Sequence, residues 1–485
     1  TAIVYEAGIV QESARGIALG QIKVTDPNDT DSFTYSIAGD YAFMFSVSDE
    51  GVLQLAENYY LDYEELGESM VLSITATDAS GLSIAQDITI EVADIEFATP
   101  AVSELTPNLV IKPTDTIIDG ILAGFTLDPD WNPNTPLTVT YSFLEADTEH
   151  LYLEVQQDVG DFGLDPSSYG FRESTIEALN YLGGILGITF VEVTETDTAV
   201  GDIRFILFNG AENETGYAGA AYPGDYGYDQ IINSSVILDI LIDASNNLDA
   251  DGNPDFSKGS YGYNTILHEI GHVLGLGHGH EGESTQYWNY GPEGDVLQET
   301  LYFESLDELG YKSYGWQGWT VMDYREYEGH SHANLSSEHP AATIIKITET
   351  GENFYATTFM PLDISAALYL YGWWDDEGIY MLNPVNSGDD TYVLEGPFFE
   401  TIHDTGGTDT LDWSATSDNT QVNLNPFSLS YFGENKLTIE DGSGQVDSVG
   451  WLLGISEFTD IENVKAGSGN DTIILNNVAN MVQAG

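Results

Sequence analysis

Four residues in one short segment have the types and the spacing of a metal site. His268 and His272 are four positions apart, so on a helix they lie on one face and can bind the same ion. Gly275 can end that helix, because glycine adopts backbone angles that other residues avoid, and the chain can then return His278 as a third ligand. Three histidines around zinc leave a fourth position open for water, which is typical of catalytic rather than structural sites.

An acidic residue inside the same segment supplies a base. Glu269 lies on the same helical turn and can accept a proton from a water whose pKa zinc lowers toward neutrality. The complete pattern is H-E-x-x-H-x-x-G-x-x-H over residues 268–278, with Asn264 or Thr265 expected near the start of its helix. It predicts hydrolysis of a polarised carbonyl. The alternative is a structural histidine trio without catalysis.

This pattern resembles the metzincin zinc proteases. Members of that family place a methionine turn beneath the zinc, and Thr320-Val321-Met322-Asp323-Tyr324 is similar to it. The resemblance implies that Met322 forms an apolar floor under the histidines. It also implies that Tyr324 binds zinc at rest and then stabilises the oxyanion, as in the serralysin and astacin branches. An ordinary tyrosine is the alternative, in a chain with 29 of them.

A third segment indicates the branch. Residues 361–372 resemble the closing helix of serralysin and matrixin catalytic domains, with apolar residues at helical spacing and Gly372 at the end. Asp363 is expected to cap this helix or to anchor it near the methionine turn. Between residue 328 and residue 352, three more histidines indicate either a surface loop or a second, weak metal site; they are His330, His332 and His339.

The downstream sequence favours serralysin, because serralysins carry a calcium-binding β-roll with the repeat G-G-x-G-x-D-x-U-x. Residues 466–473 fit this repeat, and Asn480 with Val482 continues its phase, so we expect more roll and a C-terminal secretion signal beyond residue 485. Glycine carbonyls and aspartates of stacked turns can enclose calcium in oxygen, and a plain polar turn is the alternative. The candidate ligands are Gly467, Gly469, Asp471, Asp404, Gly407, Asp409, Gly388 and Asp390.

One departure from the serralysin pattern follows the third histidine. Serralysins usually have proline there, whereas this chain has Gly279 and then His280. His278 remains the expected ligand, because its spacing from His272 is that of the metzincins.

Composition limits the class of protein. The 485 residues exceed one ordinary domain, and 42% are hydrophobic. The net charge of −69 opposes binding to nucleic acid and anionic membranes, and it suits salty surroundings or a load of calcium. The chain has no cysteine for disulfides or thiol catalysis, and no apolar run of about 18 residues for a membrane span. No signal peptide begins it, so we expect processing or a C-terminal signal.

Residues 1–96 have the alternating, turn-separated pattern of a β-sandwich, with strands expected at 20–24, 33–37, 51–55, 71–77 and 87–92. Three motifs in residues 24–28, 61–64 and 76–78 resemble cadherin repeats. The linker at 93–96 departs from the cadherin pattern, which leaves the calcium set depleted. The ligands that the resemblance implies, with solvated surface acids as the alternative, are Glu6, Asp62, Glu64, Asp94, Asp26, Asn28 and Asp78.

The catalytic domain is expected at residues 97–372. The pattern predicts a helix at 173–186 that ends at Gly187, and strands at 137–143, 188–193, 202–208 and 236–242. Residues 216–223 fit the edge strand that holds the substrate backbone in metzincins, since small residues let a peptide approach. The substrate-binding candidates are Tyr217, Ala218, Gly219, Ala220 and Ala221.

The expected architecture is therefore multidomain: an all-β cadherin-like sandwich (1–96), an α+β metzincin catalytic domain (97–372) and a serralysin-type C-terminal region with the start of a parallel β-roll (373–485). We expect a secreted, extracellular bacterial zinc endopeptidase, exported by a type I route into saline surroundings, that cleaves proteins or peptides. One Zn²⁺ is catalytic and several Ca²⁺ are structural. The alternative is a calcium-dependent adhesion or matrix protein in which proteolysis is secondary or serves self-processing.

Overall fold

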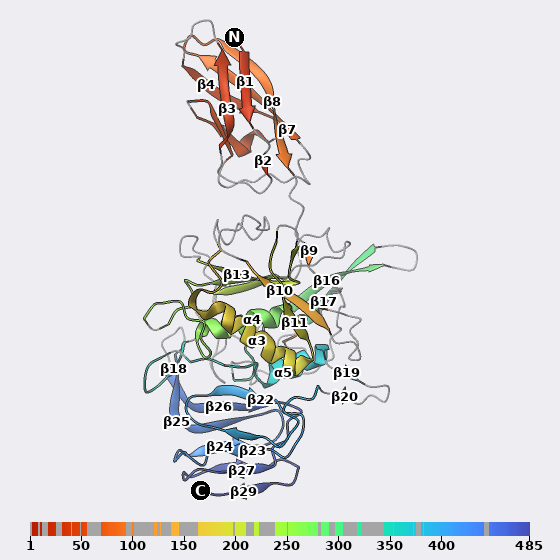
Figure 1. The fold of residues 1–485 in the computed structure, drawn as a ribbon, viewed down its shortest axis with the longest axis vertical. Coiled ribbons are helices and arrows are strands. Elements are labelled where there is room, and N and C mark those ends of the chain that lie inside the picture. The colour runs from red at the N-terminus through yellow and green to blue at the C-terminus, as the bar shows by residue number, and fades with distance from the viewer. Residues whose placement is uncertain are drawn as a thin grey trace. The chain divides into compact units, whose positions relative to one another are not determined.

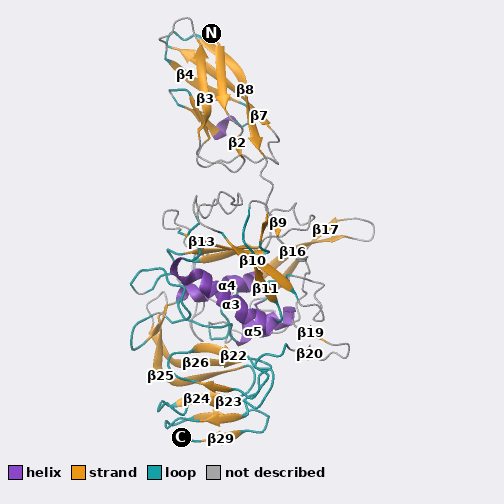
Figure 2. Cartoon of the chain, viewed as in Figure 1, coloured by secondary structure: helices purple, strands orange, loops and turns teal. Residues whose placement is uncertain are grey.

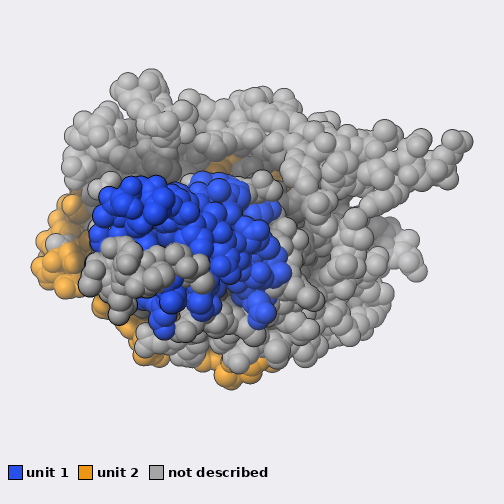
Figure 3. All heavy atoms as spheres, turned by 90° about the horizontal axis from the view of Figure 1, so that it is seen from above, with its two compact units in different colours: residues 1–98, 150–157 blue, residues 99–149, 158–485 orange. Residues whose placement is uncertain are grey.

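The structure, a computed structural model, falls into two compact units, residues 1–98 with 150–157 and residues 99–149 with 158–485 (Figure 3). The predicted boundary at residue 372 lies inside the second unit and stays a prediction. The residues that the structure describes are 2–7, 10–11, 18–25, 32–39, 41–48, 50–55, 69–93, 99–100, 118, 121–123, 127, 137–144, 163–196, 199–209, 218–222, 238–249, 251–279, 283–290, 296–303, 318–322, 344–352, 354–371, 373–374, 380–381, 383–440 and 446–485.

The first unit contains two four-stranded sheets, with the orders β1-β3-β6-β5 and β2-β8-β7-β4. Strand β1 pairs antiparallel with β3, whereas β2 pairs in parallel with β8, so the start of the chain contributes to both sheets. The elements are β1 (Ala2–Ala7), β2 (Val10–Gln11), β3 (Ala18–Thr25), β4 (Phe33–Ala38), η1 (Ala42–Met44), β5 (Phe45–Val47), β6 (Val52–Leu55), β7 (Ser69–Asp78) and β8 (Ser83–Ala93).

Burial with a period of two explains these strands. Along β7 the side chains of Met70, Leu72, Ile74 and Ala76 are buried, and the residues between them are more exposed. Residues of both sheets belong to one hydrophobic core. All five strands predicted for this region are present, as β3, β4, β6, β7 and β8.

The second unit is built on a five-stranded sheet with the order β11-β10-β13-β15-β14. The first four strands are parallel, and β14 pairs antiparallel with β15 at the edge. Helices α3, α4 and α5 (Pro361–Tyr371) share one core with residues of the sheet such as Val139, Phe205 and Ile240. The three helices and the strands of this unit are labelled in Figures 1 and 2. The elements are β10 (Thr138–Phe143), α3 (Phe171–Leu186), β11 (Thr189–Glu192), β13 (Ile203–Phe208), β14 (Gly219–Tyr222), β15 (Leu238–Asp243) and α4 (Tyr261–Val273).

The helix ends follow local sequence signals. Gly187 ends α3 in the left-handed conformation, at φ 72°, as predicted. Ser260 caps α4, because its hydroxyl accepts a hydrogen bond from the N–H of Tyr263. The expectation of a cap at Asn264 or Thr265 is therefore wrong: the helix extends a full turn further toward the N-terminus.

The C-terminal part of the second unit is β-rich. A six-stranded sheet has the order β22-β26-β25-β24-β28, with β18 also paired to β25, and a second sheet has the order β21-β23-β27-β29. Strand β18 lies inside the predicted loop 328–352, so that prediction is wrong at residues 344–347. The elements are β18 (Ile344–Ile347), α5 (Pro361–Tyr371), β21 (Thr391–Val393), β22 (Phe399–Ile402), β23 (Thr410–Asp412), β24 (Thr420–Asn423), β25 (Ser428–Glu440), β26 (Val446–Ile455), β27 (Asn463–Lys465), β28 (Thr472–Ile474) and β29 (Met481–Gln483).

The sheet β21-β23-β27-β29 is parallel throughout and places residues of one kind in register. Tyr392 pairs with Leu411, Leu411 with Val464, and Val464 with Val482. The apolar positions of the predicted repeats therefore stack on one another from strand to strand. The parallel pairing of β24 with β28 brings the 466–473 segment against the turn that precedes β24.

Three separate pairs of strands are also present among the described residues. They are β9 (Thr99–Pro100) with β12 (Ala199–Val200), β16 (Glu283–Tyr290) with β17 (Val296–Phe303), and β19 (Trp373–Trp374) with β20 (Tyr380–Met381). In the part of the chain that the structure describes, none of the helices has both the length and the apolar character that crossing a membrane requires.

Candidate metal centre

The C-terminal end of α4 redirects the chain so that a third histidine meets the first two. Gly275 has φ 93°, a conformation that favours glycine. Its N–H donates to the carbonyl of His272, and the N–H of Leu276 donates to the carbonyl of Gly271. These two bonds form a Schellman motif, which ends the helix and satisfies its last carbonyls. The helix thus ends in the structure next to Gly275, the residue that the sequence suggests as its breaker.

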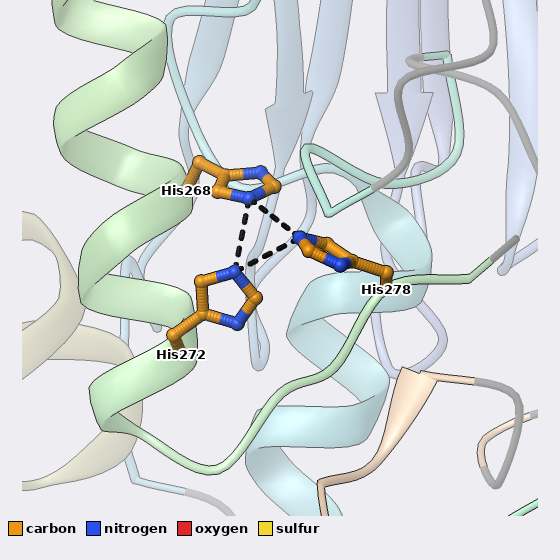
Figure 4. A group of neighbouring side chains, drawn as sticks. All are labelled: His268, His272 and His278. Atoms are coloured by element: carbon orange, nitrogen blue, oxygen red, sulfur yellow. Dashed lines mark hydrogen bonds between the residues drawn. The ribbon is translucent and has the colours of Figure 1, made fainter. Parts of the chain in front are cut away.

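The three imidazoles converge through the same ring nitrogen (Figure 4). The Nε2 atoms of His268, His272 and His278 are 3.0, 3.1 and 3.2 Å apart. Ligands bound to zinc at 2.0–2.1 Å in a tetrahedron are about 3.3 Å apart, so this spacing is close to that of neighbouring ligands of one ion. His268 is buried and the other two are half-buried.

The outer ring nitrogens determine which tautomer is present. His268 Nδ1 lies 2.7 Å from the carbonyl oxygen of Val321, and His272 Nδ1 lies 2.9 Å from that of Leu276. A carbonyl only accepts, so both Nδ1 atoms carry the proton and both Nε2 atoms present a lone pair. Burial and the neighbouring His278 lower the pKa of His272 to about 3, which keeps it neutral. Converging lone pairs repel one another unless they share a cation, so this donor set fits zinc.

Glu269 lies on α4 and is buried between this helix and strand β14. A Cβ atom at Gly219 would lie 2.7 Å from Glu269 Oε1, so only glycine lets the strand approach this closely. The N–H of Ala221 bonds the carboxylate, and Oε2 has no hydrogen-bond partner among the described residues. Burial raises the pKa of Glu269 to about 8, although the Ala221 N–H lowers it in part. A nearby dication would favour the charged form.

The predicted methionine turn lies against the same helix. Met322 is fully buried, and a Cβ atom at Gly271 would lie 2.4 Å from its Sδ atom. Asp363, at the start of α5, accepts hydrogen bonds from the Thr320 hydroxyl at 2.5 Å, from the Val321 N–H at 2.8 Å and from the Met360 N–H at 2.9 Å. Asp363 therefore caps α5 and anchors the methionine turn at once, and both predicted alternatives are realised.

The predicted edge strand is present as β14, and it borders Glu269. Ala220 and Ala221 are half-buried, as is Ala218 just before the strand. The Ala218 carbonyl accepts the N–H of Asp243 at 2.9 Å, which holds the strand on β15. Tyr217 and Tyr324 lie outside the described residues, as do His280, His330, His332 and His339, and their predicted roles stay predictions.

A second group of possible metal ligands joins two separate repeats. The carboxylates of Asp390, Asp404 and Asp409 lie within 4.8 Å of one another. Asp404 and Asp409 are buried, and burial together with neighbouring acids raises the pKa of Asp409 to about 6. A Cβ atom at Gly407 would lie 1.8 Å from the Gly388 carbonyl oxygen, so the two repeats contact each other through their glycines. Buried, mutually repelling carboxylates fit a calcium ion.

Other calcium candidates have different surroundings. Asp471 accepts a hydrogen bond from the Thr420 hydroxyl at 2.8 Å and belongs to no three-ligand group among the described residues. Gly467 and Gly469 pack closely against the backbone of the 416–418 turn. Asp78 accepts bonds from Ser80 and Leu82 in its own turn. The side chains of Glu6, Asp26, Asn28, Asp62, Glu64 and Asp94 lie outside the described residues.

Sequence reasoning missed two contributors. The Val321 carbonyl fixes the His268 ring, and backbone atoms leave no residue-type signal. Asn247 donates from Nδ2 to the carbonyl of Ala218 and accepts at Oδ1 from the Thr265 hydroxyl, both at 2.8 Å. The position of Thr265, four residues before Glu269 on the same helix face, was the available signal.

Comparison with known proteins finds metalloproteases and serralysins. The chain is 25% identical over 360 residues to the metallopeptidase AprA of Pseudomonas marginalis, covering 73% of this chain and 63% of that protein. It is 27% identical over 306 residues to the metalloprotease AprA of Pseudomonas entomophila strain L48, covering 60% and 51%. It is 30% identical over 235 residues to serralysin C of Dickeya chrysanthemi, covering 47% and 39%. The chain spans about half to two thirds of the length of the first two relatives.

Comparison with solved structures finds cadherins. Human protocadherin-24 EC1-2 covers 29% of this chain and 54% of its own, with 19% identity and a TM-score of 0.17. Drosophila N-cadherin EC1-3 covers 20% and 35%, with 26% identity and a TM-score of 0.16. No protein-family model matches the chain.

Proposed function

We propose that this protein is a secreted zinc endopeptidase of the serralysin type. The observation that carries the proposal is the convergence of three histidine Nε2 atoms, 3.0 to 3.2 Å apart, beside a buried glutamate that borders an edge strand. Similarity to metalloproteases over 60–73% of the chain supports it. His268, His272 and His278 would hold the ion.

Zinc, when bound, supplies Lewis acidity and lowers the pKa of water. Glu269 would take the proton of the attacking water and pass it to the leaving amine. The edge strand β14 would pair with the substrate backbone, which gives affinity with little sequence preference. Tyr324 is proposed to stabilise the oxyanion, by resemblance to serralysins.

Calcium is proposed to stabilise the C-terminal part. Asp390, Asp404 and Asp409 are the ligands best supported by geometry, and the in-register parallel strands support a roll-like arrangement. The first unit is proposed to be a cadherin-like module, supported by a sandwich in which the initial strands pair with both sheets. The binding of this module to its partner would depend on calcium.

Metal analysis tests the proposal. We expect one zinc per chain, loss of protein cleavage with a zinc-selective chelator, and recovery when zinc is restored. Zinc-free protein that cleaves equally well would contradict it. Binding to cells or matrix that survives chelation, with no cleavage, would favour the adhesion alternative.

A further inference from the structure

Asn247 lies between the proposed substrate strand and the zinc helix. It is fully buried, with Nδ2 2.8 Å from the carbonyl oxygen of Ala218 and Oδ1 2.8 Å from the hydroxyl of Thr265. Ala218 directly precedes β14, and Thr265 lies on α4 one turn before Glu269. A single side chain therefore connects the strand to the helix face that carries the base.

The partners of Asn247 fix the orientation of its amide. Nδ2 lies 2.8 Å from the carbonyl oxygens of both Ala218 and Asp243. Carbonyls only accept, so the NH₂ group faces them and the amide oxygen faces the Thr265 hydroxyl. The single hydrogen of that hydroxyl is within reach of Asn247 Oδ1, at 2.8 Å, and of the Tyr261 carbonyl oxygen, at 3.0 Å. Reversing the amide would place oxygen against two carbonyls. The buried link therefore has one arrangement, and disturbing it leaves polar groups unsatisfied.

The turn that carries Asn247 is held in place by hydrogen bonds to the Asp243 side chain. The Asp243 carboxylate is buried and accepts the N–H of Ser245 at 2.8 Å, the Ser245 hydroxyl at 2.7 Å and the Asn246 side-chain amide at 2.9 Å. These bonds close the turn that follows β15. The turn therefore fixes the backbone of Asn247, and the hydrogen bonds to Ala218, Asp243 and Thr265 fix its side chain.

The strand that Asn247 holds is in direct contact with the base. A Cβ atom at Gly219 would lie 2.7 Å from both Thr265 Cγ2 and Glu269 Oε1. The N–H of Ala221 bonds the same carboxylate. Misplacement by about 1 Å at such a site can cost roughly 100-fold in rate. A small shift of β14 would therefore change the position of the Glu269 carboxylate and of any peptide backbone paired with the strand.

The geometry points to Asn247, acting with Thr265, as a positioning residue: it sets the separation between the substrate strand and the general base. This inference rests on the proposed function. Zinc content should not depend on Asn247, because the outer nitrogens of His268 and His272 are held by Val321 and Leu276 instead.

Four variants of the full chain test the link. Asn247→Asp keeps the size but places a second oxygen against two carbonyls. Thr265→Val removes the hydroxyl and keeps a methyl group against Gly219, whereas Thr265→Ser keeps the hydroxyl. Asn253→Asp is the matched control, because Asn253 is exposed and the charge change is the same.

The readouts are zinc content, kcat and KM on a long internally quenched peptide, and calorimetric affinity for a peptide whose central amide is reduced. We expect Asn247→Asp and Thr265→Val to keep one zinc, to lower kcat/KM at least about tenfold and to weaken the affinity similarly. Thr265→Ser and Asn253→Asp should stay within about threefold of the native chain.

A purely structural role predicts a different result. Zinc-loaded Thr265→Val with a lower Tm but native kcat/KM and peptide affinity would overturn the inference, even if Asn247→Asp fails to fold. If the native chain itself neither cleaves nor binds peptide, the proposed function fails instead. The strand linkage is then judged by exchange of the Asp243 amide hydrogen, which bonds Ala218: faster exchange in Thr265→Val supports it, and unchanged exchange contradicts it.

Discussion

At the scale of single residues, hydrogen bonds to ring nitrogens decide what the histidines can do. His268 and His272 each donate through Nδ1 to a carbonyl, so each Nε2 carries a lone pair where the three rings meet. Glu269 is buried beside them with its carboxylate against the backbone of Gly219. The sequence alone predicts the residue types of this site. It does not predict the carbonyls that orient the rings, because these come from the backbone of distant segments.

A methyl group at Gly219 should lower the catalytic activity without causing loss of zinc. In Gly219→Ala the new Cβ would lie 2.7 Å from Glu269 Oε1, so the strand or the carboxylate must move. We expect kcat/KM to fall roughly 10- to 100-fold with zinc retained. Steady-state kinetics and metal analysis measure both. Gly184→Ala is the control, because no atom lies within 4 Å of its added Cβ; equal kinetics in the two variants would argue against close contact.

At the scale of elements, one buried carboxylate couples the closing helix to the metal centre. Asp363 on α5 bonds Thr320 and Val321, and the Val321 carbonyl in turn holds His268. Sequence resemblance predicts the neighbourhood of this helix and the methionine turn. The link from Asp363 through Val321 to His268 was not predictable, because it depends on how three separate segments pack.

Asp363→Ala should weaken both folding and metal binding. It leaves the Val321 and Met360 N–H groups and the Thr320 hydroxyl without their acceptor, which we expect to cost about 3 kcal/mol or more of unfolding free energy. Zinc affinity should fall about 10- to 100-fold, since His268 loses its orienting turn. Denaturant titration and competitive zinc binding measure these. Asp363→Asn can keep both N–H bonds through one oxygen, so an equal loss in that variant would contradict the account.

The cluster of Asp390, Asp404 and Asp409 should make the stabilising effect of calcium depend on pH. The folded pKa of Asp409, about 6, exceeds its ordinary 3.8, so in cation-free protein its contribution to stability is fully present below pH 3.8 and is lost as pH rises through 6. Calcium relieves the buried charge above that window. We therefore expect the Tm gain from calcium to be larger at pH 7 than at pH 4.

Matched variants separate this effect from general charge. Asp409→Asn should lose most of the calcium-dependent gain at pH 7, whereas Asp460→Asn, at an exposed position, should keep it. Calorimetry with and without calcium makes the comparison. The same gain in both variants would mean that calcium acts elsewhere.

At the scale of the whole molecule, negative charge is the dominant property. The chain carries −69, and at least five of its 11 basic residues are engaged in ion pairs. Composition predicted this character. Sequence patterns also placed the strands of the first unit, where burial alternates along β7, and the strands β13 and β15 of the second unit, which are continuously buried apolar runs. The pairing of β18 with β25 escaped prediction, since it joins segments about 90 residues apart.

Salt should stabilise the chain by screening this repulsion. Raising NaCl from 0.05 to about 1 M shortens the Debye length from over 10 Å to about 3 Å, so Tm should rise. Calorimetry in a salt series tests this, with sucrose at matched osmolality as the control. A Tm that responds equally to sucrose, or not at all to salt, would show that self-repulsion does not limit stability.

The most direct test of the central claim is cleavage of an unfolded protein substrate, at high salt with calcium, by three samples. These are the native chain, the native chain with a zinc-selective chelator, and the zinc-loaded Glu269→Gln variant. We expect cleavage by the first sample alone, with the activity of the variant reduced at least about 100-fold while it keeps one zinc per chain. Native-like cleavage by Glu269→Gln, or by the chelated protein, would contradict a zinc site with Glu269 as its base.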